Sequence, residues 1–263
     1  MDWIEVNGAA LRFDIQGGGT KPLVLIHEMG GTLESWSDVV PLVLPGRRVL
    51  RYDTRGAGLS EKILGEVSLD TMTADLAALL DALGLTGRVA LAGIAVGAAI
   101  GIHFAARYPA RTSALIAMAP ATGMAPERRA AALAGVARME KEGVRPGTDP
   151  MLAQTYPAQL RGDTKRYERL RNQRLGNDPA SYAAIYRMLA GLDMAASLAA
   201  VRCPALVLGG EYDGLRPPPG CEAVARAIPG AKFRAVASGH FMATQTPDIV
   251  AEAINGFLGE VGG

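Results

Sequence analysis

Short apolar runs alternate with helical patterns along the first half of the chain. Each run leads into a loop with glycine or proline, and the runs with their loops are PLVLIHEMGG (22–31), RRVLRYDTRGAG (47–58), GRVALAGIAVG (87–97) and TSALIAMAPA (112–121). Residues 68–85 form an amphipathic helix pattern, and residues 95–109 form a helix pattern rich in small side chains. Because strands covered on both faces read as continuous apolar blocks, the pattern predicts an α/β fold with a mostly parallel sheet and helices on both faces. A β-hairpin with its turn at Asn7-Gly8 is predicted before the first of these strands.

The pattern changes between residues 123 and 197, which are charged and helical and contain no strand pattern. We therefore expect an inserted helical cap at 123–197, and an α/β core built from residues 1–122 and 198–263. The sheet pattern resumes in CPALVLGGEYD, which ends at Asp213. It continues with a helix from about Cys221 to Ile228, a strand at 231–238 and a last helix at 247–258.

The amino-acid composition indicates which classes of binding partner to expect. The chain has 27 basic and 26 acidic residues, so its net charge of +1 favours neither nucleic acid nor a membrane surface. It has no apolar run of about 18 residues and no secretory pattern at its start. The two cysteines, Cys203 and Cys221, suit buried thiols in a reducing compartment. We expect a cytoplasmic protein with a small-molecule substrate and no metal or cofactor; a homo-oligomer is left open.

Residues 93–97, Gly-Ile-Ala-Val-Gly, have the glycine frame of a nucleophile elbow, the sharp strand-to-helix turn that exposes an attacking side chain. They lack the lysine of a P-loop and the spacing of a dinucleotide fingerprint. An elbow predicts an acid after a later strand and a histidine near the C-terminus. Asp213 is that acid, with Glu211 as second choice, and His240 is that histidine. The centre of the frame is Ala95, whose methyl group cannot attack a substrate.

Taken together, these motifs resemble the α/β-hydrolase superfamily, and within it the 3-oxoadipate enol-lactonase group. The similarity spans nearly the whole chain, and the loop DTRGAGLS (53–60) resembles the family's D-x-R-G-x-G-x-S loop. The resemblance implies a hydrolase whose oxyanion hole uses the backbone N–H groups of Met29 and Val96. Two positions depart from the family: Ala95 replaces the nucleophile serine, and Glu28 replaces a glycine beside the hole. Glu28 is then either a solvent-facing or paired carboxylate, or an acid/base that reaches the substrate.

Alanine at position 95 has three interpretations. A serine was replaced, and the parent performs acyl transfer with Asp213 and His240. Alternatively the alanine is natural, and His240 activates a water held where the hydroxyl would be; the same site without serine could decarboxylate a 3-keto acid. In the third interpretation the protein binds a small molecule without chemistry. Both leading interpretations give a hydrolase of esters, lactones or amides.

The cap carries many arginines, and we expect most of them to lie on a solvated helical face. Arg187 lies in SYAAIYRMLAGLD, an otherwise apolar helix pattern, so we expect it to point inward and pair with a substrate carboxylate. Four further side chains are candidates for the apolar lining of the pocket: Trp36, Met118, Tyr156 and Met242.

Overall fold

The fold is an eight-stranded sheet with helices on both faces, seen in a computed structural model that describes residues 1–262. The strands are β1 (Asp2–Val6), β2 (Ala9–Gln16), β3 (Lys21–Ile26), β4 (Arg47–Tyr52), β5 (Val89–Ile94), β6 (Thr112–Met118), β7 (Ala205–Gly210) and β8 (Lys232–Val236). Their order across the sheet is β1-β2-β4-β3-β5-β6-β7-β8. The pairs β1–β2 and β2–β4 are antiparallel, and all the others are parallel.

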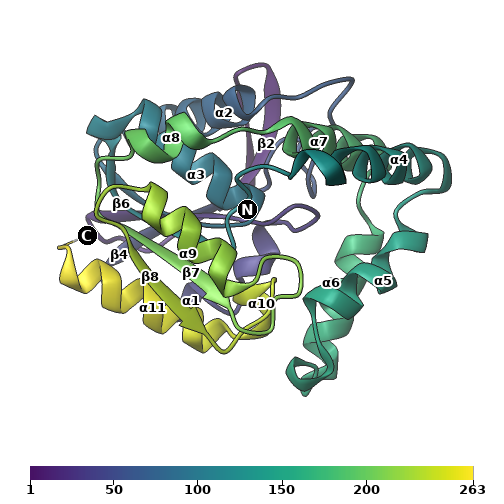
Figure 1. Cartoon of the computed structure of the whole chain (residues 1–263). Helices are drawn as coiled ribbons and strands as arrows, with labels where there is room; N and C mark the ends of the chain where they lie inside the picture. Colours follow the sequence, from purple (N-terminus) through teal and green to yellow (C-terminus); the bar gives the residue numbers. More distant parts are fainter. Residues whose placement is uncertain (263) are drawn as a thin grey trace.

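The helices divide into three groups. One face of the sheet carries α2 (Leu69–Ala82), α3 (Val96–Arg107), α8 (Ala195–Ala200) and α9 (Pro218–Ala227). The other carries α1 (Val40–Val43), α10 (Met242–Gln245) and α11 (Pro247–Glu260). The third group lies to one side of the sheet, at the right of Figure 1, and consists of α4 (Pro126–Glu142), α5 (Arg145–Thr155), α6 (Thr164–Leu175) and α7 (Pro179–Gly191). Short 3₁₀ turns lie at Leu33–Trp36, Pro109–Arg111 and Ala158–Leu160.

The central strands bury both of their faces. In β5 every residue is buried, with Leu91 on the side of α3 and its neighbours Ala90 and Ala92 on the side of α11. This explains the continuous apolar run, which a half-exposed strand would not show. The hairpin also forms where the sequence predicts it, because Asn7 and Gly8 both take positive φ angles (50° and 69°). The mostly parallel, doubly covered α/β sheet predicted from the sequence is thus confirmed.

The sequence placed one helix start incorrectly. The helix predicted from Cys221 begins at Pro218, because proline fits the first turn of a helix, where its missing N–H has no partner to lose. In residues 1–262 no helix is long and apolar enough to cross a membrane.

Helices α4–α7 form the segment between β6 and α8, which we interpret as the cap. Where the chain leaves the sheet and returns to it, Gly123 and Asp193 form an isolated antiparallel bridge. Within the segment, α4 packs against α7 and α5 against α6. The two ends of the cap segment are therefore joined by this bridge. The four cap helices pack in pairs against one another.

Both cysteines should be inert in the folded protein. Cys203 and Cys221 are buried, and desolvation raises the pKa of each thiol to about 11. Below the unfolded pKa of about 8.5, the two buried thiols contribute fully to the free energy of unfolding. This contribution is lost as the pH rises above this value and through the raised pKa of the folded state. We expect a thiol-specific aromatic disulfide reagent at pH 8 to modify both thiols in the denatured protein and neither thiol in the native protein. Modification at the denatured rate in the native protein would contradict this expectation.

Candidate active site

The turn between β5 and α3 has the strained backbone of a nucleophile elbow. Ala95 has φ 50° and ψ −108°, a conformation that residues with a side chain rarely adopt. It is held by three backbone hydrogen bonds: Ala95 N–H donates to the Met118 carbonyl (2.9 Å), and the Ala95 carbonyl accepts the N–H groups of Ala99 and Ala121 (3.1 Å each). Such strain persists only when the surroundings fix the backbone. The geometry that exposes a nucleophile is therefore complete at a residue that carries only a methyl group.

Two glycines make this turn possible. A Cβ on Gly93 would lie 2.4 Å from the backbone of Gly97. A Cβ on Gly97 would lie 2.3 Å from the carbonyl oxygen of Ile26. The glycine frame is thus a steric requirement for packing α3 against β3 and β5.

We expect Gly97→Ala to destabilise the protein by about 3 kcal/mol, because backbone atoms cannot move aside as a flexible side chain can. In a chain of this size the melting temperature would fall by about 5–10 °C. Gly101→Ala in the same helix is the matched control, since its Cβ would meet only the mobile end of Leu115 at 3.2 Å. Thermal unfolding of both variants measures the difference; equal melting temperatures would show that the close approach is unimportant.

The structure brings Asp213 and His240 together. Asp213 Oδ2 lies 2.8 Å from His240 Nδ1, and both residues are buried. Asp213 Oδ1 accepts the N–H groups of Leu215 and Arg216, each at 2.9 Å. Burial alone would raise the pKa of Asp213, but the hydrogen bond and charge of His240 and these N–H donors outweigh it and lower that pKa. The ionised carboxylate therefore accepts the Nδ1 proton and leaves Nε2 as the basic nitrogen.

The expected oxyanion donors lie at the same place. Met29 and Val96 line the cavity that contains Ala95 and His240. Val96 is the first residue of α3, so its N–H has no acceptor within the helix. Among residues 1–262 no acceptor is hydrogen-bonded to either N–H. Both groups are therefore available to an oxyanion.

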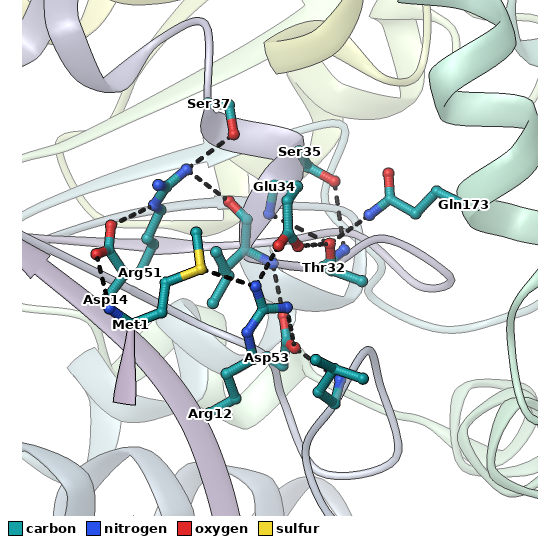
Figure 2. Close-up of polar contacts among 12 residues, drawn as sticks. Met1, Arg12, Asp14, Thr32, Glu34, Ser35, Ser37, Arg51, Asp53 and Gln173 are labelled. Atoms are coloured by element: carbon teal, nitrogen blue, oxygen red, sulfur yellow. Dashed lines mark hydrogen bonds and ion pairs between the residues drawn. The ribbon is translucent and has the colours of Figure 1, made fainter. Parts of the chain in front are cut away.

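A polar network holds the loop that carries Met29 (Figure 2). Asp53 is fully buried; it accepts Arg12 Nη1 at 3.2 Å and Leu33 N–H at 2.7 Å. Gln173 of α6 donates to the hydroxyl of Thr32, the residue that caps the 3₁₀ turn Leu33–Trp36. The core thus fixes this loop from one side, and the cap contacts it from the other.

Two neighbours of Gln173 extend that contact. Arg174 donates to the Met29 carbonyl (3.1 Å) and to the Tyr182 hydroxyl (2.9 Å), and Asn177 donates to the Gly30 carbonyl (3.1 Å). The end of α6 therefore binds three residues of the oxyanion loop, and the position of the Met29 N–H depends on the cap.

The cavity in front of Ala95 has a volume of about 480 Å³ and a strongly basic lining. Four arginines line it: Arg128, Arg138, Arg174 and Arg216. Among residues 1–262 none of the four forms an ion pair, and no aspartate or glutamate lines the cavity. Desolvation, only partly offset by the more distant Asp213, lowers the pKa of Arg216. The cavity thus concentrates positive charge that the protein itself does not neutralise.

Arg187 does not contribute to that charge, so the prediction that it points inward is wrong. Its side chain is 42% exposed and pairs with Glu140 of α4. Ala183 and Ala184 lie one turn before Arg187 on the same side of α7 and are buried, yet Arg187 itself is exposed. The apolar pattern of this helix marks its packed face, and a long cation in that pattern reaches water instead.

The four apolar candidates belong to the core. Trp36, Met118 and Met242 are fully buried with the sheet and α11, and Tyr156 is buried in a small cluster under the cap. None of them lines the cavity. Phe241, the neighbour of Met242, lines it instead, with its ring 4.8 Å from the Arg174 guanidinium.

Glu28 is buried and turned away from the cavity. One of its carboxylate oxygens accepts the Ser35 hydroxyl at 3.1 Å, beside Gly31. It is neither solvent-facing nor paired with an arginine, and it is absent from the cavity lining. Its position suits support of the oxyanion loop.

Sequence reasoning did not identify Arg174 and Arg216. Arg174 lies four residues after Leu170, and these are the two buried residues of α6. This i, i+4 spacing on one helix face is a signal that could have identified it. Arg216 follows Asp213 by three residues, in the loop that positions the acid, but nothing in the local pattern shows that its side chain turns inward.

The elbow turn, the hydrogen-bonded Asp213–His240 pair and the residues Met29 and Val96 thus meet at one cavity. The sequence model of the family described as the alpha/beta hydrolase fold matches residues 21–245, and the chain belongs to this family. It is 29% identical over 271 residues to a protein of Azorhizobium caulinodans named as the carbamate hydrolase RutD, covering 99% of each. A match at 38% identity over 118 residues, to an acetyltransferase component of the acetoin cleaving system of Pseudomonas putida, spans only 32% of that protein.

Two solved structures are similar over nearly their whole length. A thermophilic esterase from Thermogutta terrifontis, solved with malate bound, has a TM-score of 0.93 and 29% identity, covering 99% of both chains. The enol-lactonase of Burkholderia xenovorans has a TM-score of 0.91 and 26% identity, covering 98% of this chain and all of the other. The predicted similarity to enol-lactonases is therefore confirmed.

Proposed function

We propose that the protein hydrolyses a small anionic carboxylic ester, lactone or amide. The observation that carries this proposal is a single cavity that holds Ala95, His240 and both N–H donors among four arginines without acidic partners. A carboxylate of the substrate is the natural partner for those guanidinium groups. The enol-lactonase and the malate-bound esterase among the similar structures support the same class of substrate.

In the proposed reaction, water occupies the space beside the Ala95 methyl group. His240 Nε2 takes a proton from this water as its oxygen attacks the carbonyl carbon. The carbonyl oxygen becomes an oxyanion that accepts the N–H groups of Met29 and Val96. When the intermediate collapses, the bond to the leaving group breaks and the imidazolium returns the proton to that group. Asp213 stabilises the imidazolium throughout.

The test compares pairs of small esters and lactones that differ only in one carboxylate. We expect the protein to hydrolyse the anionic member of each pair with the higher kcat/KM. His240→Ala should abolish this turnover, and His103→Ala should not, because His103 lies on the outside of α3 near Asp70. Turnover that survives His240→Ala, or no turnover of any pair, would overturn the proposal.

Arg216→Gln should raise KM for the anionic substrates by about 10- to 100-fold, because hydrogen bonds to charged groups are each worth about 1.5–3 kcal/mol. KM for the neutral substrates should change little. Arg187→Gln is the matched control, since Arg187 carries the same charge but lies on the surface. Steady-state kinetics distinguish the two variants, and equal effects on both substrate classes would contradict an anion-binding role.

A further inference from the structure

A second cavity lies inside the cap, next to the catalytic one. Its volume is about 270 Å³, and every residue that lines it belongs to residues 131–186. One wall is the face of α4 that carries Ala132, Gly135, Val136 and Met139. The opposite wall comes from Val144 and the first turns of α5. This compartment is thus lined by cap residues alone, whereas the catalytic cavity lies between the cap and the sheet.

The two cavities share part of their walls. Six residues line both of them: Arg138, Gly147, Met151, Arg174, Tyr182 and Tyr186. At this boundary Arg174 is held by Tyr182 and the Met29 carbonyl, so its charge stays at the junction. Beyond the junction the lining is mainly alanine, glycine, valine, methionine and proline, with Glu142 as its acidic residue. A molecule at the catalytic site therefore meets a charged junction and then an apolar space.

We infer that this cap compartment binds an apolar arm of the substrate while the carboxylate and the reacting carbonyl stay in the catalytic cavity. The inference rests on the proposed hydrolysis of an anionic substrate. It adds that the same substrate also carries an apolar group. An apolar cavity of about 150 Å³ is enough to hold a benzene ring, so the compartment accommodates a phenyl group or a chain of about six carbons. The substrate is thus an amphipathic acid derivative rather than a short dicarboxylate.

Gly135 provides a direct test, because a Cβ at this position would meet no atom within 4 Å and would enter the compartment. Gly135→Leu therefore places a side chain in this space from a Cβ that contacts no other atom, and leucine is the better helix former. Ala132→Leu enters the same space one turn earlier. Gly256→Leu in α11 is the matched control, since Gly256 is an exposed helix residue with open space around it and lines neither cavity.

Calorimetry with straight-chain carboxylates from propanoate to octanoate measures binding without any need for turnover. In the unmodified protein we expect the Kd to fall about fourfold for each added CH₂ group until the compartment is full. Gly135→Leu and Ala132→Leu should abolish most of this length dependence while Gly256→Leu keeps it. The Kd for propanoate should be the same in all four proteins.

Two results would overturn the inference: a Kd independent of chain length in the unmodified protein, or an unchanged length dependence in both filled variants. Neither result depends on catalysis, so the outcome is separate from that of the His240→Ala test. A protein that binds long acids in a Gly135-dependent way but hydrolyses nothing would retain the compartment and disprove the proposed hydrolysis.

Discussion

Ala95→Ser is expected to increase the rate of ester hydrolysis by at least about 10³-fold. The backbone at residue 95 already has the elbow conformation, and Asp213 and His240 are already joined at 2.8 Å. A triad that lacks its serine retains only the share of catalysis contributed by binding and the oxyanion hole, roughly 10³–10⁴-fold over water. Supplying the hydroxyl should restore the covalent route, in which the serine oxygen attacks and His240 takes its proton.

The measurement is steady-state turnover together with titration by a phosphonate ester. One equivalent of phosphonate should inactivate the serine variant and leave the alanine protein unmodified. Ala121→Ser is the matched control, because Ala121 lines the same cavity and is not at the elbow. A folded Ala95→Ser protein that neither reacts with the phosphonate nor gains activity would show that position 95 and His240 do not cooperate.

Asp213→Asn is expected to lower kcat of the Ala95→Ser variant by about 10⁴-fold. An asparagine amide at this position would donate to Nδ1 and place the imidazole proton on Nε2, so the base would face the wrong way. Since the pKa of Asp213 is lowered in the folded protein, its carboxylate stays ionised above its unfolded pKa of about 3.9. Its stabilising contribution is lost only as the pH falls below that value and through the folded pKa.

Glu211→Gln serves as the control for this substitution. Glu211 was the second candidate for the acid, carries the same charge, and is exposed two residues before Asp213. Its substitution should leave kcat and the pH profile nearly unchanged. If Glu211→Gln caused the larger loss, the assignment of the acid to Asp213 would be wrong.

The candidate positions Ala95, Asp213 and His240 could be chosen from the sequence because the elbow motif fixes their order along the chain. The elbow needs glycine at positions 93 and 97 for steric reasons, and the acid and the histidine follow particular strands in a fixed order. The sheet was predictable because its central strands are buried on both faces and so contain few polar residues. These rules identify positions along the chain, and the structure adds the close approach of Ile26 that makes glycine necessary at position 97.

The sequence predicted a helical cap at 123–197, but not the way its helices are built and oriented. Helix α5 contains Pro146, Gly147 and Pro150, which read as helix breakers. It forms nonetheless because Leu152 is buried and the helix packs against α6, so tertiary contacts outweigh propensity. Which arginine side chains face the cavity depends on how each helix is rotated about its axis. The apolar pattern around Arg187 led to the wrong choice of arginine. Arg174, which does line the cavity, lies on a helix with few apolar residues.

The hydrogen bonds from α6 to residues 29–32 link the position of the Met29 N–H to the position of the cap. Gln173, Arg174 and Asn177 bind the loop residues Thr32, Met29 and Gly30. A ligand that binds Arg174 is therefore expected to stabilise the end of α6 and residues 29–32 together. Amides of residues 29–32 and of α6 should then gain protection from hydrogen exchange together, as one cooperative unit.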